Sequence, residues 1–175
     1  MKEFLQGKWL KHPLHPILAH VPTALWPAAL LFDILANLGV GGNAMVQTSF
    51  YCIAFGLVSA LGAIPTGLAD WWDIKPGKPA RTLGLYHMAL NLTVTVLQIA
   101  NLFLRLDTLT TSTTVSALPF ALSILSTLLL LVSGYLGGRM VYDQGISIAR
   151  NSKDEWRKRA ERAGAAVPKK EGAEG

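Results

Sequence analysis

The sequence predicts an all-α integral membrane protein, a four-helix bundle whose helices run up-down-up-down. The chain has 175 residues, of which 51% are hydrophobic and only 15% charged, whereas an average soluble domain is about 25% charged. Residues 13–69 contain one charged side chain, Asp33, and residues 82–104 and 108–138 contain no Asp, Glu, Lys or Arg. A bilayer span needs about 20 apolar residues. It must also satisfy its backbone internally, so each span is expected to be helical.

The spans can be placed in order along these stretches. The first should begin at Pro16, because proline is favoured at the first helical position, and should end before a glycine-rich turn at 39–43. The second should end before Asp70-Trp71-Trp72-Asp73, whose tryptophans suit a membrane interface. A Thr/Ser-rich turn at 108–114 separates the third span from the fourth. The predicted helices cover residues 16–38, 46–69, 82–106 and 115–138.

The two ends of the chain differ from the spans. Residues 1–15 mix lysines with apolar side chains and are expected to form an amphipathic interfacial segment. The apolar run that follows is full length and lacks a small-residue cleavage site, so we expect a span there rather than a signal peptide. Residues 139–175 form a basic tail, predicted to be helical from about residue 152 and then disordered. The single Cys52 is expected to be an inert apolar thiol.

Basic residues indicate the orientation. Of the 16 Lys and Arg residues, all except Arg105 lie in the N-terminal segment, the loop at 70–82 or the C-terminal segment. The positive-inside rule then predicts an inner (plasma) membrane protein with both termini in the cytoplasm. The pI of about 9.5 needs no nucleic-acid partner, because a basic tail is attracted to anionic lipid. Other membrane subunits or further copies of the chain remain alternative partners.

Polar residues inside spans are costly and often functional. Five of them share one face of the third predicted helix, since their spacings of 4, 7, 3 and 4 match the helical period. This face is expected to point into the bundle, where hydrogen bonding between helices is one explanation for it. Near the outer end, Asp33 is expected to meet Arg105 at the same depth, or to cap a loop amide. The five residues are His87, Asn91, Gln98, Asn101 and Arg105.

Histidines suggest a cofactor on the cytoplasmic side. His20 and His87 each lie about one turn inside a helix from that side, and two histidines on facing helices suit bis-imidazole ligation of haem b. Asp70 closes the second helix at this level, and Arg139 or Arg81 is placed to meet the haem propionates. Alternatively, His15, His20 and His87 with Asp70 bind a divalent metal. A third alternative is structural: His20 donates to a carbonyl freed by Pro22 or Pro27 in the first helix.

Three sequence elements also resemble a known family. They are His12-Pro-Leu-His15-Pro-Ile-Leu-Ala-His20-Val-Pro22 with the later Asp33, Gly67-Leu-Ala-Asp70-Trp71, and Gly137-Gly138-Arg-Met-Val-Tyr142-Asp-Gln-Gly145, together with His87. They resemble the membrane proteins of the domain of unknown function 2231 family, over residues 12–149. The resemblance implies a compact four-span protein and leaves the biochemical role open. Some relatives are joined to iron–sulfur electron-transfer domains, which favours a redox role.

Three functions fit these observations. The first is membrane electron transfer by a haem protein, with His20 and His87 as axial ligands. The second is a non-catalytic subunit or scaffold of a larger membrane complex, favoured by small residues on the second and fourth helices. The third is a small transporter that uses the polar face of the third helix. No nucleophile–base set appears in the sequence, so we expect no catalytic activity of its own.

Overall fold

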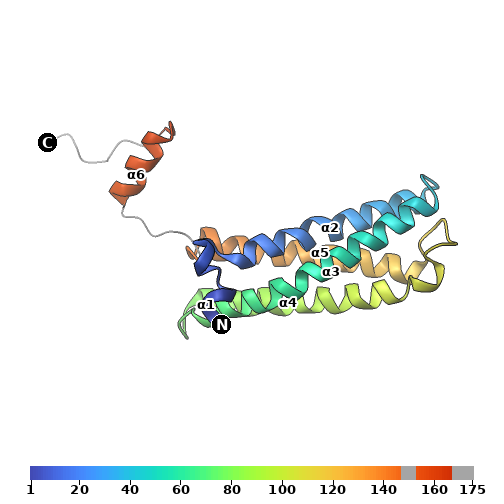
Figure 1. The fold of residues 1–175 in the computed structure, drawn as a ribbon, viewed down its shortest axis with the longest axis horizontal. Helices are drawn as coiled ribbons and strands as arrows, with labels where there is room; N and C mark the ends of the chain where they lie inside the picture. Colours follow the sequence, from blue (N-terminus) through green and yellow to red (C-terminus); the bar gives the residue numbers. More distant parts are fainter. Residues whose placement is uncertain (147–152, 167–175) are drawn as a thin grey trace.

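A computed structural model of the chain describes residues 1–146 and 153–166. In these residues every regular element is helical. Four helices are long and apolar enough to cross a membrane, which confirms the predicted all-α, four-span architecture (Figure 1). They are α2 (Leu14–Asn37), α3 (Asn43–Trp72), α4 (Pro79–Phe103) and α5 (Ala117–Tyr142).

The helices begin or end a few residues from the predicted positions. α2 starts at Leu14 because Pro13, in an extended conformation, is its N-cap. α3 continues through the two tryptophans to Trp72, since neither glycine nor proline occurs between Gly67 and Pro76. α4 starts at Pro79 rather than at residue 82, and proline at the first turn costs no hydrogen bond. The α3 extension keeps Asp70 on the helix, and the α2 start brings His15 into its first turn.

The bundle consists of two helical hairpins. α2 packs most extensively on α3, and α4 on α5, while α3–α4 and α2–α5 form the smaller contacts between hairpins. α2 and α4 therefore lie diagonally across the bundle. The connections alternate between its two ends (Figure 1). We call the end with the 73–78 loop, the start of α2 and the end of α5 the basic end. The end with the 38–42 and 104–116 connections is the distal end.

Small residues let the helices approach closely. Trp26 of α2 is buried and donates from Nε1 to the Ile53 carbonyl of α3, at 3.3 Å. Its ring lies so near Gly56 that a Cβ there would be 2.3 Å from Nε1. Large apolar side chains such as Leu31, Phe55 and Leu131 are exposed on the outside of the bundle. An apolar exterior around small, polar interior residues is what helix packing in a bilayer requires.

Proline removes hydrogen-bond donors from α2, and one freed carbonyl finds a new partner. α2 remains helical through Pro22 and Pro27. The Leu18 carbonyl, which Pro22 deprives of its helical partner, accepts a hydrogen bond of 2.8 Å from Ser59 Oγ of α3. The sequence suggested His20 as a donor to a carbonyl freed by proline. At the Leu18 carbonyl, Ser59 is the donor instead.

The N-terminal segment is attached to the basic end. It consists of α1 (Lys2–Leu5) and the 3₁₀ turn η1 (Lys8–Leu10). Lys2 and Gln6 both donate to the Asp73 carboxylate after α3, and Gln6 Nε2 also donates to the Ala69 carbonyl at 3.1 Å. In the tail, α6 (Lys153–Arg162) provides the expected basic helix. The disorder expected at the end of the tail concerns residues 167–175, outside the described residues.

Candidate functional site

A buried ionic network joins all four long helices near the distal end. Arg105, just after α4, donates to both carboxylate oxygens of Asp33 in α2 at 2.7 Å. The Asp33 side chain is 0% exposed and that of Arg105 is 3% exposed. Ser49 of α3 and Ser123 of α5 each lie 3.0 Å from a guanidinium nitrogen. The predicted Asp33–Arg105 pair is therefore confirmed, and its charges are compensated within the bundle.

The polar face of α4 points inward, as predicted. Gln98 and Asn101 are completely buried, and Asn101 Oδ1 accepts from Arg105 Nε at 2.8 Å. Asn101 Nδ2 in turn donates to Ser123 Oγ at 3.0 Å and to Gln98 Oε1 at 3.1 Å. The Asn101 amide thus makes its hydrogen bonds to side chains within the bundle. In the distal half of the bundle the ion pair and Asn101 are satisfied by neighbouring side chains, whereas Gln98 Nε2 and Ser126 Oγ are buried without a hydrogen-bond partner among the described residues.

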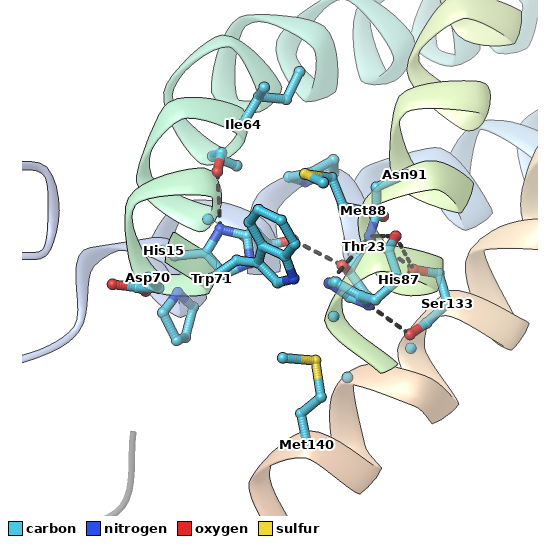
Figure 2. Close-up of a pocket in the computed structure, with 18 of the residues that line it drawn as sticks. His15, Thr23, Ile64, Asp70, Trp71, His87, Met88, Asn91, Ser133 and Met140 are labelled. Carbon is cyan, nitrogen blue, oxygen red and sulfur yellow. Dashed lines mark hydrogen bonds between the residues drawn. The ribbon is translucent and has the colours of Figure 1, made fainter. Parts of the chain in front are cut away.

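A pocket occupies the half of the bundle near the basic end. Its volume is about 350 Å³, and all four long helices line it, which falls in the range of small-molecule sites. Figure 2 shows its polar side chains arriving from different helices: His15 from α2, Trp71 from α3, His87 from α4 and Ser133 from α5. Most of the remaining lining is aliphatic. The pocket therefore suits a largely apolar ligand that is fixed by a few polar groups.

His15 is held by α3. Its Nδ1 lies 2.8 Å from the Ala63 carbonyl, so the imidazole carries its proton on Nδ1. The ring rests on Gly67, one turn further along α3, where an added Cβ would be 2.7 Å from His15 Cε1. Nε2 has no hydrogen-bond partner among residues 1–146 and 153–166. The ring is thus oriented by main chain, with a free lone pair.

His87 is held by α5 in the same manner. Its Nδ1 lies 2.8 Å from the Ser133 carbonyl, and its ring rests on Gly137, where a Cβ would be 3.0 Å from Cε1. Asn91 Nδ2 is 3.1 Å from His87 Nε2. The same amide nitrogen also faces Ser133 Oγ at 2.7 Å and the His87 carbonyl at 2.8 Å. The Asn91 amide has two hydrogens for these three acceptors. It can satisfy both of them with Ser133 Oγ and the His87 carbonyl, which leaves His87 Nε2, the acceptor at the longest distance, available to a ligand.

The two imidazoles face each other across the pocket. Their ring centroids are 6.3 Å apart, and the ring planes are 87° apart. Both use Nδ1 for a main-chain carbonyl, the arrangement by which proteins fix the tautomer of metal-ligating histidines and raise their basicity. The pair that the structure brings together is therefore His15 and His87, whereas the sequence favoured His20 and His87.

The other predicted site residues are less central. His20 is an exposed residue of α2 that reaches the pocket lining. Asp70 is half-buried and lines both this pocket and a shallow hollow beneath the N-terminal segment. Arg139 is exposed and paired with Asp143 through a 2.8 Å contact, and it is absent from the lining. Arg81 stacks over the Trp71 ring, 4.1 Å from its centroid.

Metal binding by three or more protein ligands has no geometric support. Within residues 1–146 and 153–166, no group of three His, Cys, Asp or Glu side chains is arranged to hold an ion. The alternative set of His15, His20 and His87 with Asp70 does not form such a cluster. A cofactor that brings most of its own ligands and needs only two from the protein is compatible with the pair.

Sequence reasoning did not identify the residues that orient the histidines. The Ala63 and Ser133 carbonyls and the small residues Gly67 and Gly137 do this work. A signal was present, because in both helices the glycine stands four residues after the carbonyl, on the same helix face. The same pattern occurs where small residues only pack two helices together. Only the position of the imidazole shows that here the glycine and the carbonyl hold a histidine ring.

These features define an integral membrane protein with a four-helix bundle, a satisfied ionic core at one end and a two-histidine pocket at the other. The chain belongs to the DUF2231 family, described as predicted membrane proteins, whose family model matches residues 11–150. No curated protein and no solved structure matches the chain.

Proposed function

We propose that this protein is a membrane electron carrier that holds haem b in the pocket, with His15 and His87 as its axial ligands. The observation that carries the proposal is the pair of facing imidazoles, each fixed through Nδ1 to a main-chain carbonyl. Bis-histidine ligation between the helices of a bundle is an established way to bury a haem. The diagonal placement of α2 and α4 puts one ligand on each side of the bundle axis.

The spacing of the rings supports axial ligation. A metal–nitrogen bond is about 2.0 Å. An ion bound by both imidazoles would hold the two ring centres no more than about 6 Å apart. The centroids of His15 and His87, 6.3 Å apart, are therefore close enough for both rings to hold one ion.

The surroundings support a redox role. A haem held by His15 and His87 would supply one-electron redox chemistry. The largely apolar lining and the hydrogen bonds of the two imidazoles would tune its reduction potential. Electrons would enter or leave at the basic end, where the pocket lies closest to the surface. Soluble or membrane-bound redox partners are expected there.

The test is the visible spectrum of protein purified from haem-replete cells. We expect a Soret band and a sharp α-band on reduction, both lost in His15→Ala and in His87→Ala. His20→Ala is the matched control, because it removes an imidazole from the same helix that reaches the pocket from an exposed position. It should keep the spectrum.

Two results would overturn the proposal. One is a colourless protein that remains folded by circular dichroism and does not take up haem added during purification. The other is a haem spectrum that survives in the His15→Ala, His87→Ala double variant. A spectrum lost in His20→Ala but kept in His15→Ala would restore the pairing that the sequence favoured.

A further inference from the structure

α2 and α4 match at several positions at an offset of 72, the separation of His15 and His87. The same offset relates Asp33 to Arg105, the two partners of the buried ion pair. It superposes identical residues at Leu18/Leu90, Thr23/Thr95 and Ala28/Ala100. Pro22, Trp26, Ala29 and Asp33 are buried in α2, and their equivalents Val94, Gln98, Asn101 and Arg105 are buried as well.

α3 and α5 correspond at an offset of 70, the separation of Gly67 and Gly137. Every buried residue of α5 has a buried equivalent in α3 at this offset. The correspondence includes the groups that hold the imidazoles, since Ala63 is equivalent to Ser133. The buried pairs are Ser49/Pro119, Ile53/Ser123, Gly56/Ser126, Ala60/Leu130 and Ala63/Ser133.

Hydrogen bonds repeat with the same offsets. Thr23 Oγ1 donates to the Ala19 carbonyl at 2.7 Å, and Thr95 Oγ1 donates to the Asn91 carbonyl at 2.8 Å. The His15–Ala63 and His87–Ser133 contacts, both 2.8 Å, form a second equivalent pair that crosses from one helix to its hairpin partner. The second pair is the informative one, because Thr48, Thr93 and Thr127 also donate to the carbonyl four residues earlier.

We infer that the hairpins α2–α3 and α4–α5 are two copies of one structural unit, related by a two-fold axis along the bundle, and that the pocket is a two-fold site on this axis. Equivalent residues line it from both copies, including Ala19/Asn91, Thr23/Thr95 and Gly67/Gly137. A ligand in this pocket takes one imidazole from each copy in equivalent positions. This last statement rests on the proposed function; the repeat itself does not.

The ion pair explains why each hairpin packs on the other hairpin and not on a second copy of itself. Asp33 and Arg105 occupy the same position in the two copies and meet close to the axis. Two copies of the α2–α3 hairpin would bring two carboxylates together there, and two copies of α4–α5 would bring two guanidinium groups. Like charges that are buried and unpaired are strongly unfavourable. The complementary charges therefore direct each hairpin to the other one.

Distances between spin labels test the repeat in the full chain. Four exposed positions form two equivalent pairs at the offsets: Leu31 with Phe103, and Phe55 with Leu125. In a Cys52→Ser background, cysteines at these positions carry the labels, two at a time. The axis requires the 31–125 distance to equal the 55–103 distance, and the 31–55 distance to equal the 103–125 distance. The pairs 31–103 and 55–125 cross the axis and carry no such equality.

A second variant tests the site. Ala19→Asn copies the Asn91 side chain into the equivalent position of the first repeat, and the two-fold site predicts that haem uptake and the reduced α-band are retained. Distance pairs that differ by more than the width of the label distributions would overturn the repeat. Equal distances with haem lost in the symmetrised variant would overturn the two-fold site. A colourless parent protein would overturn the haem proposal and leave the distance test in force.

Discussion

Asp33 and Arg105 form an ion pair that the low-dielectric interior of the bundle makes costly to break. The desolvation of both charges is offset only because the contact is bidentate and the remaining donors and acceptors are also satisfied. Ser123 Oγ contributes to both partners, since it accepts from Arg105 at 3.0 Å and donates to Asp33 at 2.7 Å. Removing one charge leaves the other uncompensated.

We therefore predict that Asp33→Leu destabilises the protein by about 3–5 kcal/mol, the cost of leaving one member of a buried pair alone. Asp33→Leu combined with Arg105→Met should be more stable than Asp33→Leu, because the double variant contains no orphaned charge. Thermal unfolding in detergent, followed by circular dichroism, measures both. The control is Asp143→Ala, which removes an exposed ion pair with Arg139. An unchanged melting temperature in Asp33→Leu would contradict the prediction.

The sequence was sufficient to predict the ion pair but not the histidine pair. Asp33 and Arg105 were the only charges within their spans, and their equal depth along two helices that run in the same direction left each with one partner. The histidines were different, because the sequence offered three near the start of α2. Counting from Pro16 placed His15 before the helix, whereas the helix begins at Leu14 and turns His15 toward α3. A shift of two residues at a helix start decided which imidazole enters the pocket.

Helices α3 and α5 act on the site through glycine. At Gly67 and Gly137 the imidazole packs directly on the helix backbone, and this contact lets Nδ1 reach the carbonyl four residues earlier. A methyl group at either position occupies the space of the ring. Gly134, on the same face of the pocket, has no atom within 4 Å of an added Cβ.

Gly67→Ala is accordingly predicted to displace His15 and to abolish haem binding or lower haem occupancy at least several-fold. Gly137→Ala should have a smaller effect on His87, because the contact is 3.0 Å rather than 2.7 Å. Gly134→Ala is the matched control and should keep the ligand, with a gain in helix propensity of up to about 1 kcal/mol. Haem per protein measures the outcome. Equal occupancy in all three variants would show that the glycines do not set the ring positions.

The N-terminal segment is attached to the C-terminal end of α3 through the Asp73 carboxylate and the Ala69 carbonyl. Hydrogen bonds from Lys2 and Gln6 hold the pKa of Asp73 below its ordinary value of 3.8. A carboxyl whose pKa is depressed in the folded state contributes stability above its ordinary pKa, and this contribution disappears as the pH falls through the lowered value. The contact with Asp73 is thus complete at neutral pH and is lost in acid, whereas the hydrogen bond from Gln6 to the Ala69 carbonyl does not titrate.

NMR titration of the Asp73 carboxyl tests this attachment. We expect a pKa below 3.8 in the wild type and a rise toward that value in Lys2→Ala, which removes the largest cause of the shift. Lys11→Ala is the control, since Lys11 is exposed and makes no contact with the carboxylate. Added salt should reduce the shift, because the pair is at the surface. A value of 3.8 or above in the wild type would contradict the contact.

At the scale of the whole molecule, the number of helices could be predicted and their neighbours could not. Span length and the absence of charge determine the four helices. Which helices pack together depends on which face of each helix points into the bundle. α5 is apolar on nearly all sides, so its sequence does not indicate which face is buried. Three of the five buried residues of α5 are serines, so small side-chain size rather than hydropathy identifies most of its interior face. The repeat could have been found from sequence by the shared offset of the two histidines and the two charges.

The distribution of basic residues predicts the orientation in the membrane, which decides from which side the pocket is reached. Residues 1–11, 75–81 and 139–170 contain every Lys and Arg residue except Arg105, which is buried in its ion pair. We predict that the basic end faces the cytoplasm, by the positive-inside rule. A fluorescent protein fused to the C-terminus should therefore fluoresce, and alkaline phosphatase at the same position should be inactive. Phosphatase fused in the 104–116 connection should be active. The reverse pattern would place the pocket, and the redox partner expected there, on the outer side.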